Sequence, residues 1–215
     1  MKNFLSSKSK IIDVDLVQLK KMSVELAKQV RRNDYEPEHI LYVERAGLLI
    51  GYEVARFFNC SISGIHSKRS GETLKSKVKV ILRYLPGFVT HMLRRLELKS
   101  NIHEIKKNRN VYCEKNLPPT DKRILIIDDA IDTGYSLVAI LEFLEKHGCK
   151  KEMVKTGVLT TTGTKQVIRA DFSLFAQIIC AFPWSYDSGE YTKTQKLYNF
   201  IKAEIAKHVP VVIRL

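Results

Sequence analysis

The sequence has no long apolar run, no internal repeat and no low-complexity tract. No stretch reaches the ~20 apolar residues that a membrane-spanning helix requires. The first fifteen residues, MKNFLSSKSKIIDVD, contain no apolar segment as long as that of a secretory signal peptide. We therefore expect a cytoplasmic protein with no membrane span.

Cysteine is scarce and scattered. The four cysteines, Cys60, Cys113, Cys149 and Cys180, are far apart and form no CxxC pair, and the six histidines show no metal-ligand spacing. This pattern argues against a structural zinc site. We expect reduced, buried thiols, as is usual inside cells.

Positive charge is in excess and unevenly distributed. The 215 residues are 45% hydrophobic and 27% charged, which is typical of a globular chain, and we expect a single domain over 1–215. The net charge is +13, and nine of these charges lie in 66–110, which holds twelve Lys or Arg and three Glu. Such an excess favours anionic partners such as phosphates or nucleic acid.

Apolar runs alternate between strand-like and helix-like patterns along the chain. Strands are predicted over 39–43, 61–66, 110–114, 123–128, 154–159 and 175–182, and helices over 13–32, 48–58, 136–147 and 193–208. Asp13 is the expected N-cap of the first helix. This alternation predicts an α/β fold with a mainly parallel sheet flanked by helices.

The most informative segment is ILIIDDAIDTGYS, residues 124–136. Its four apolar residues predict a buried strand, and Asp128 and Asp129 follow at the carboxyl end, where open α/β sheets bind ligands. The segment then enters a helix, whose free N–H groups suit a phosphate, and Gly134 permits close backbone approach. Clustered carboxylates repel one another unless a cation or hydroxyl donors lie among them, which favours a metal-sharing site.

This segment resembles the motif that binds 5-phosphoribosyl-1-pyrophosphate (PRPP) in type I phosphoribosyltransferases: four apolar residues, two acidic, two variable, then D-T-G-x-T/S. Every defining position matches, with Ser136 in place of the commoner threonine. The resemblance implies the type I phosphoribosyltransferase fold, with a small hood and a C-terminal helix at about 175–215. It also implies transfer of a phosphoribosyl group from PRPP to a nitrogenous base.

The resemblance also implies residue roles. Asp128 and Asp129 would bind the ribose hydroxyls directly or through Mg²⁺, the expected cofactor. Asp132 would be the catalytic general base towards a purine. The residues that would bind the 5-phosphate are Asp132, Thr133, Gly134, Tyr135 and Ser136.

A second match follows the first predicted strand. Glu44, Arg45, Ala46 and Gly47 lie where the family has its pyrophosphate loop, often x-R-G-G, with Ala46 here in place of glycine. Arg45 would contact pyrophosphate and assist catalysis, and Gly47 would let backbone N–H groups turn towards it. In the family this loop often contains a non-proline cis peptide, which would fall at Glu44–Arg45.

The third match concerns the base. The sequence Ala-Phe182-Pro-Trp184 resembles the hood of xanthine-guanine phosphoribosyltransferases, where an aromatic ring stacks on the purine. Phe182 or Trp184 would supply that ring, unless Trp184 belongs to the core or a dimer interface. Members that bind 6-oxopurines have a lysine on the strand after the PRPP helix, but threonines occupy that strand here. Lys165, several residues later, is the candidate substitute.

The basic insertion at about 70–106 replaces a shorter mobile loop of the family. It could be a solvated basic face with an apolar stripe packed on a neighbouring subunit, a lid over pyrophosphate, or a surface for nucleic acid or membrane. We expect a homo-oligomer, dimer or tetramer, that acts in nucleotide salvage with a purine acceptor. The alternatives are a PRPP-binding regulator that binds nucleic acid and a transferase with a non-purine acceptor.

Overall fold

A computed structural model describes residues 10–69, 109–113, 116–162, 165–185 and 188–207. The strands are β1 (Lys10–Asp13), β2 (His39–Val43), β3 (Ser61–Arg69), β4 (Arg109–Cys113), β5 (Ile124–Ile131), β6 (Val154–Thr161), β7 (Phe172–Ala176) and β8 (Ile178–Ala181). The helices are α1 (Leu16–Arg32), α2 (Gly47–Phe58), α5 (Tyr135–Lys146) and α6 (Tyr191–Lys207), with a short 3-10 helix at Lys151–Met153. The insertion predicted at 70–106 lies outside the described residues.

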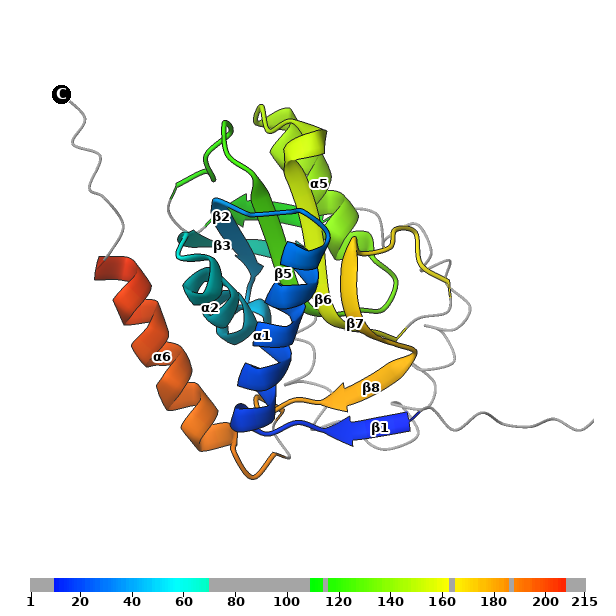
Figure 1. The fold of residues 1–215 in the computed structure, drawn as a ribbon, viewed down its shortest axis with the longest axis vertical. Helices are drawn as coiled ribbons and strands as arrows, with labels where there is room; N and C mark the ends of the chain where they lie inside the picture. Colours follow the sequence, from blue (N-terminus) through cyan, green and yellow to red (C-terminus); the bar gives the residue numbers. More distant parts are fainter. Residues whose placement is uncertain (1–9, 70–108, 114–115, 163–164, 186–187, 208–215) are drawn as a thin grey trace, which may run out of the picture.

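The central sheet is mainly parallel, as predicted. Among the described residues, six strands are ordered β4-β3-β2-β5-β6-β7, and only β4 runs antiparallel to its neighbour. The strands β2 and β5 lie side by side in the middle of the sheet, so their carboxyl ends meet (Figure 1). The α/β class is confirmed.

Helices cover both faces of this sheet (Figure 1). The helices α1 and α2 pack with Leu125 and Ile127 of β5 on one face, whereas α5 packs with Ile124 and Ile126 on the other. Alternate residues of β5 therefore belong to different cores, which explains why the strand is a continuous apolar run. None of the described helices is both long enough and apolar enough to cross a membrane.

A second, two-stranded sheet was not predicted. β1 pairs in parallel with β8, from Lys10↔Ile178 to Asp13↔Ala181, beside the lower end of β7 in Figure 1. The prediction of one strand over 175–182 was wrong, because the chain turns at Gln177, which has a φ of 58°. The strand β8 and the helix α6 fall within the range of about 175–215 expected for the hood and C-terminal helix, whereas β1 lies outside it.

Several element boundaries also differ from those predicted, two of them near residues assigned a role. The N-cap of α1 is Asp15, not Asp13: its carboxylate accepts from Gln18 N at 2.6 Å, and Gln18 Oε1 accepts from Asp15 N at 2.9 Å. The strand β5 continues through both aspartates to Ile131, because Ala130 and Ile131 still pair with β6.

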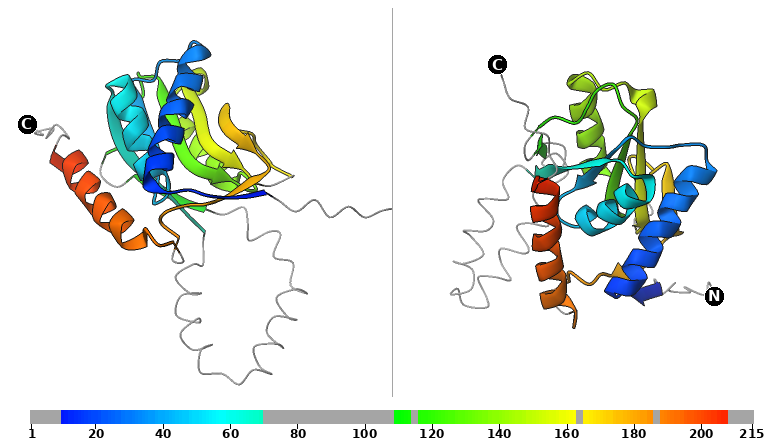
Figure 2. Two further views of the ribbon diagram at one scale, coloured as in Figure 1. Left: turned by 60° about the horizontal axis from the view of Figure 1, so that its bottom comes forward. Right: turned by 60° about the vertical axis from the view of Figure 1, so that its left-hand side comes forward.

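The helix α6 lies on the outer side of α2, apart from the central sheet (Figures 1 and 2).

Candidate active site at the carboxyl ends of β2 and β5

The pairing of β2 with β5 brings the two main sequence motifs together. Tyr42 is in register with Ile127, so the loop after β2 begins beside Asp128. Gly47, at the start of α2, packs so closely on β5 that a Cβ there would lie 2.4 Å from Ile127 O. Glycine is therefore required at this position for close approach of the two elements, a reason that the sequence alone did not suggest.

Asp128 and Asp129 form a crowded carboxylate pair. Asp128 Oδ1 accepts from Asp129 N at 2.9 Å, and Asp129 Oδ1 accepts from Ala130 N at 2.7 Å. Burial, followed by the neighbouring Asp129, raises the pKa of Asp128 well above its ordinary value. Burial likewise raises the pKa of Asp129, although hydrogen bonds from its neighbours oppose the shift.

Groups from distant parts of the chain surround this pair. The guanidinium of Arg109 on β4 lowers the pKa of Asp128, against the dominant effect of burial. The Trp184 side chain likewise lowers the pKa of Asp129, against the dominant effect of burial. Neither interaction was predictable from the sequence, because Arg109 looked like one more charge of the basic segment and Trp184 was considered only for the base, the core or a dimer interface.

The predicted phosphate-binding turn begins the helix α5. Gly134 has a φ of 85° and its carbonyl accepts from Val138 N at 3.0 Å. A side chain at Gly134 would be strained by this backbone and would also meet Ile168 Cγ2 at 2.9 Å. Tyr135 and Ser136 form the first turn of α5, where free N–H groups and the helix dipole attract an anion.

The segment after β6 packs against this turn. Val167 N donates to Thr133 O at 3.0 Å, and Gln166 Nε2 donates to Ile131 O at 3.3 Å. Lys165 precedes these residues and is exposed. It therefore directly precedes the residues that pack on the predicted phosphate-binding turn.

The threonines of β6 have structural roles. Thr160 is fully buried, and its hydroxyl donates to Ile178 O of β8 at 2.6 Å. Thr161 O accepts from Gln177 N, also at 2.6 Å. Both bonds tie β6 to the segment that contains β8. Only the Thr160 bond uses the side chain and so accounts for a threonine; the Thr161 bond uses the backbone carbonyl.

The loop after β2 contains the cis peptide bond that the resemblance implied, at Glu44–Arg45. Arg45 is exposed, and Asp132 beyond β5 is exposed as well. The Glu44 side chain is only 2% exposed and forms an ion pair with Lys202 of α6 at 2.8 Å. The sequence motif thus presents its arginine to solvent while its glutamate faces the protein.

The two candidate base-stacking rings differ in position. Phe182 and Trp184 stack on each other, with centroids 4.7 Å apart and ring planes at 12°. Phe182 is buried in the core, whereas Trp184 is partly exposed and covers it. Of the two rings, Trp184 is the one with area left for a ligand.

The chemistry of the site suits an anion beside a divalent cation. In the described part of the chain, no group of three or more acidic, histidine or cysteine side chains could hold a metal ion. The pair Asp128–Asp129 nevertheless fits Mg²⁺, which commonly takes one or two carboxylates and completes its shell with water and substrate oxygens. The mutual repulsion of the pair would be relieved by such a cation.

A protein-family model matches most of the chain. Residues 15–190 match the family described as "Phosphoribosyl transferase domain". A curated relative is the uracil phosphoribosyltransferase of Finegoldia magna, 29% identical over 138 residues, which are 58% of this chain and 66% of that protein. The match thus spans just under two thirds of the relative's length.

Solved structures share the fold. One is a purine phosphoribosyltransferase from Pyrococcus horikoshii, with a TM-score of 0.55 and 20% identity over 81% of this chain and 94% of that chain. Another is the xanthine-guanine-hypoxanthine phosphoribosyltransferase of Helicobacter pylori, with a TM-score of 0.56 and 20% identity over 87% and 99% of the two chains.

Proposed function

This chain belongs to the phosphoribosyl transferase domain family, and we propose that it transfers the 5-phosphoribosyl group of PRPP to a ring nitrogen of a purine and releases pyrophosphate. The observation that supports this most strongly is the pair Asp128–Asp129, which lies between the phosphate-binding turn of β5–α5 and the loop after β2. Carboxylates flanked by two anion-binding backbone segments suit a sugar that carries phosphate at both ends.

The 5-phosphate subsite in this proposal is the turn from Asp132 to Ser136. Thr133 and Ser136 contribute hydroxyl donors, and the first turn of α5 contributes backbone N–H groups. The packing of residues 166–168 on this turn fixes its backbone before any ligand arrives. A preformed turn lowers the ordering cost of binding.

The ribose subsite is the carboxylate pair. Asp128 and Asp129 would accept hydrogen bonds from the two ribose hydroxyls or hold Mg²⁺ against them. When bound, Mg²⁺ would neutralise negative charge on the pyrophosphate group. The raised pKa values of the pair indicate an environment that disfavours two free carboxylates, and a cation or hydroxyl donors would favour their ionised forms.

The pyrophosphate subsite is the loop from Glu44 to Gly47. The exposed Arg45 guanidinium would pair with pyrophosphate oxygens and stabilise the charge that develops as the C1–O bond breaks. The purine nitrogen attacks C1 from the opposite side, and the exposed Asp132 accepts or orients the proton of the base. Positioning and exclusion of water supply most of the remaining catalysis.

The base subsite is proposed at Trp184. Its ring stacks on Phe182, and its side chain is close enough to Asp129 to lower the pKa of that carboxyl, which supports a place beside the ribose subsite. Lys165 is the candidate for a hydrogen bond to an exocyclic oxygen of the base. The relative from Finegoldia magna is a uracil enzyme, which keeps a pyrimidine acceptor as the second candidate. The reaction would belong to nucleotide salvage in either case, carried out by a cytoplasmic homo-oligomer.

The test is pyrophosphate release from Mg-PRPP with guanine, hypoxanthine, xanthine, adenine and uracil in parallel. We expect turnover with at least one purine, and its loss in Asp132→Asn but not in Asp121→Asn, an exposed aspartate before β5 that serves as the matched control. Turnover with uracil alone would replace the purine by the pyrimidine. If Mg-PRPP does not bind at all by calorimetry, the transferase proposal fails.

A further inference from the structure

Glu44 has an unusual position for an acidic residue in a proposed anion site. Its backbone N–H donates to Ile65 O at 2.9 Å, and its side chain is only 2% exposed. It directly precedes Arg45, the residue proposed to bind pyrophosphate. An unpaired carboxylate here would be costly to bury and would repel the incoming pyrophosphate.

The helix α6 supplies the groups that Glu44 requires. Lys202 Nζ lies 2.8 Å from Glu44 Oε1, and the Tyr198 hydroxyl donates to Glu44 Oε2. Tyr198 and Lys202 are four residues apart and so lie on the same face of the helix. The Lys202 ammonium also lies 5.4 Å from the centroid of the Tyr198 ring, so the two side chains hold each other in place.

The helix itself is anchored to the rest of the protein. Glu190, just before α6, accepts a hydrogen bond from Leu16 N at the start of α1, at 2.7 Å. Thr194 and Ile201 of α6 are 1% and 4% exposed. A helix held at its start and along its buried face can transmit a fixed position to the side chains that it carries.

We propose that α6 positions the pyrophosphate loop through the Glu44 clamp, defined as Glu44, Tyr198 and Lys202. Tyr198 and Lys202 are positioning residues: they fix the Glu44 side chain, and thereby the backbone on which Arg45 stands. Lys202 also neutralises the carboxylate nearest to the pyrophosphate subsite. The inference rests on the proposed function for its ligand, but the clamp itself is a property of the free protein.

The first test examines the loop without any ligand. Hydrogen exchange is compared between wild type, Lys202→Met and Lys196→Met at the amides of Glu44 and Leu48, which donate to Ile65 O at 2.9 Å and to Arg45 O at 3.3 Å. Lys196 is an exposed lysine on the same helix, so its variant makes the same charge change away from the clamp. We expect exchange to be roughly tenfold faster in Lys202→Met alone, since the buried Glu44 carboxylate loses its ion-pair partner. Unchanged exchange in Lys202→Met overturns the clamp.

The second test examines binding by calorimetry with inorganic pyrophosphate and with Mg-PRPP. We expect Lys202→Met to weaken both by about tenfold to a hundredfold, with little change in the Michaelis constant for the base. Lys202→Arg should restore much of the affinity, and Tyr198→Phe should cause a smaller loss. A general loss of stability would instead change the apparent affinities for base and PRPP alike.

A double variant decides whether Lys202 acts through Glu44. If it does, Lys202→Met in a Glu44→Gln background should have little further effect on pyrophosphate affinity. Losses that multiply would mean that Lys202 binds pyrophosphate directly, which overturns the positioning role. If wild type binds neither pyrophosphate nor Mg-PRPP, the proposed function fails, whereas the exchange experiment still decides for or against the clamp.

Discussion

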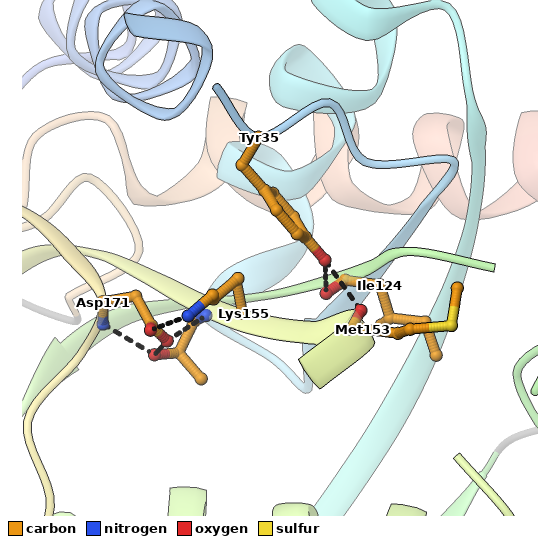
Figure 3. Close-up of polar contacts among 6 residues, drawn as sticks. Tyr35, Ile124, Met153, Lys155 and Asp171 are labelled. Atoms are coloured by element: carbon orange, nitrogen blue, oxygen red, sulfur yellow. Dashed lines mark hydrogen bonds and ion pairs between the residues drawn. The ribbon is translucent and has the colours of Figure 1, made fainter. Parts of the chain in front are cut away.

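The two ends of the central sheet treat their polar groups in opposite ways. At the amino end, the Tyr35 hydroxyl lies 2.8 Å from the carbonyl oxygens of both Ile124 and Met153. Asp171 accepts from Lys155 at 3.0 Å, and Figure 3 shows this ion pair beside the tyrosine. Every group of this network has its partner within the protein, so the network stabilises the fold and requires no ligand.

At the carboxyl end, the charged groups are arranged to bind a ligand rather than to pair with one another. Asp128 and Asp129 are adjacent and partly shielded, and burial raises the pKa of each. Arg45 and Asp132 face solvent. Two groups of like charge at a strand end cost stability unless a cation or donor comes between them, and such cost is typical of binding sites.

A polar cavity at the amino end of the sheet also contains charged groups that pair within the protein. A cavity of about 410 Å³ there is lined by Arg31, Glu36, Glu38 and Arg123, among others. Four of its charged side chains form two ion pairs, Arg31 with Glu36 at 3.7 Å and Arg123 with Glu38 at 3.4 Å, and Lys122 lines it as well. A cavity lined by charged residues is therefore not enough to indicate a ligand site. The unrelieved repulsion between Asp128 and Asp129 at the other end is the more useful indication of one.

The largest expected effect concerns catalysis at the carboxyl end. Asp132→Asn removes the proposed general base, so we expect turnover with a purine to fall by roughly 10²–10⁴. PRPP affinity and thermal stability should change little, because Asp132 is exposed. Steady-state kinetics and calorimetry measure the two quantities separately. Turnover at the wild-type rate would restrict Asp132 to shaping the phosphate turn.

The next effect concerns stability at the amino end. Asp171→Ala removes the acceptor for Thr156 N at 2.9 Å, for the Thr156 hydroxyl at 2.7 Å and for Lys155. Because Thr156 is buried, its N–H would be left without a partner, and we expect a loss of about 3 kcal/mol in the free energy of unfolding. Urea denaturation measures it, with the exposed Glu152→Ala as control. The folded fraction should still bind Mg-PRPP normally.

The third prediction concerns the carboxylate pair, where we expect weaker ligand binding with no loss of stability, the opposite of Asp171→Ala. Asp128→Asn and Asp129→Asn should each weaken Mg-PRPP binding by roughly 1.5–3 kcal/mol, because contacts to ribose hydroxyls or to the metal are lost. The free protein should be as stable as wild type at pH 7 or more so, since the crowding of two carboxylates is relieved. Calorimetry and urea denaturation of the same samples test both statements. Unchanged PRPP affinity in both variants would refute the ribose assignment.

The sequence predicted much of this arrangement and missed specific parts of it. The apolar run of β5 and the motif after it predicted the strand–turn–helix unit, because buried parallel strands and glycine turns have strong local signals. The roles of Glu44 and Arg109 were not predictable, since each depends on a residue far away in the chain. The β1–β8 sheet was missed because four-residue strands carry little periodicity, and Gln177 gives no local sign of its turn.

The smallest effect is a pH dependence that distinguishes the two ends by its sign. At the amino end, His39 lies between the hydroxyls of Ser61 and Ser63, and burial lowers its pKa to about 4. The folded state then binds fewer protons than the unfolded state, so this contribution to stability is present above pH 6.5 and is lost as the pH falls towards 4. Between pH 7.5 and 5.5 the loss should be about 1 kcal/mol.

The carboxylate pair acts in the opposite direction. The raised pKa of Asp128 makes the folded state bind more protons, so the free protein gains stability as the pH falls from that raised value towards the ordinary one. In His39→Gln, the loss on acidification between pH 7.5 and 5.5 should therefore disappear, and any remaining slope should have the opposite sign. Urea denaturation at the two pH values measures this, with the exposed His147→Gln as control. If His39→Gln loses as much stability as wild type between pH 7.5 and 5.5, the buried histidine is not the source of that loss. The two ends of the sheet would then not differ in the sign of their pH dependence.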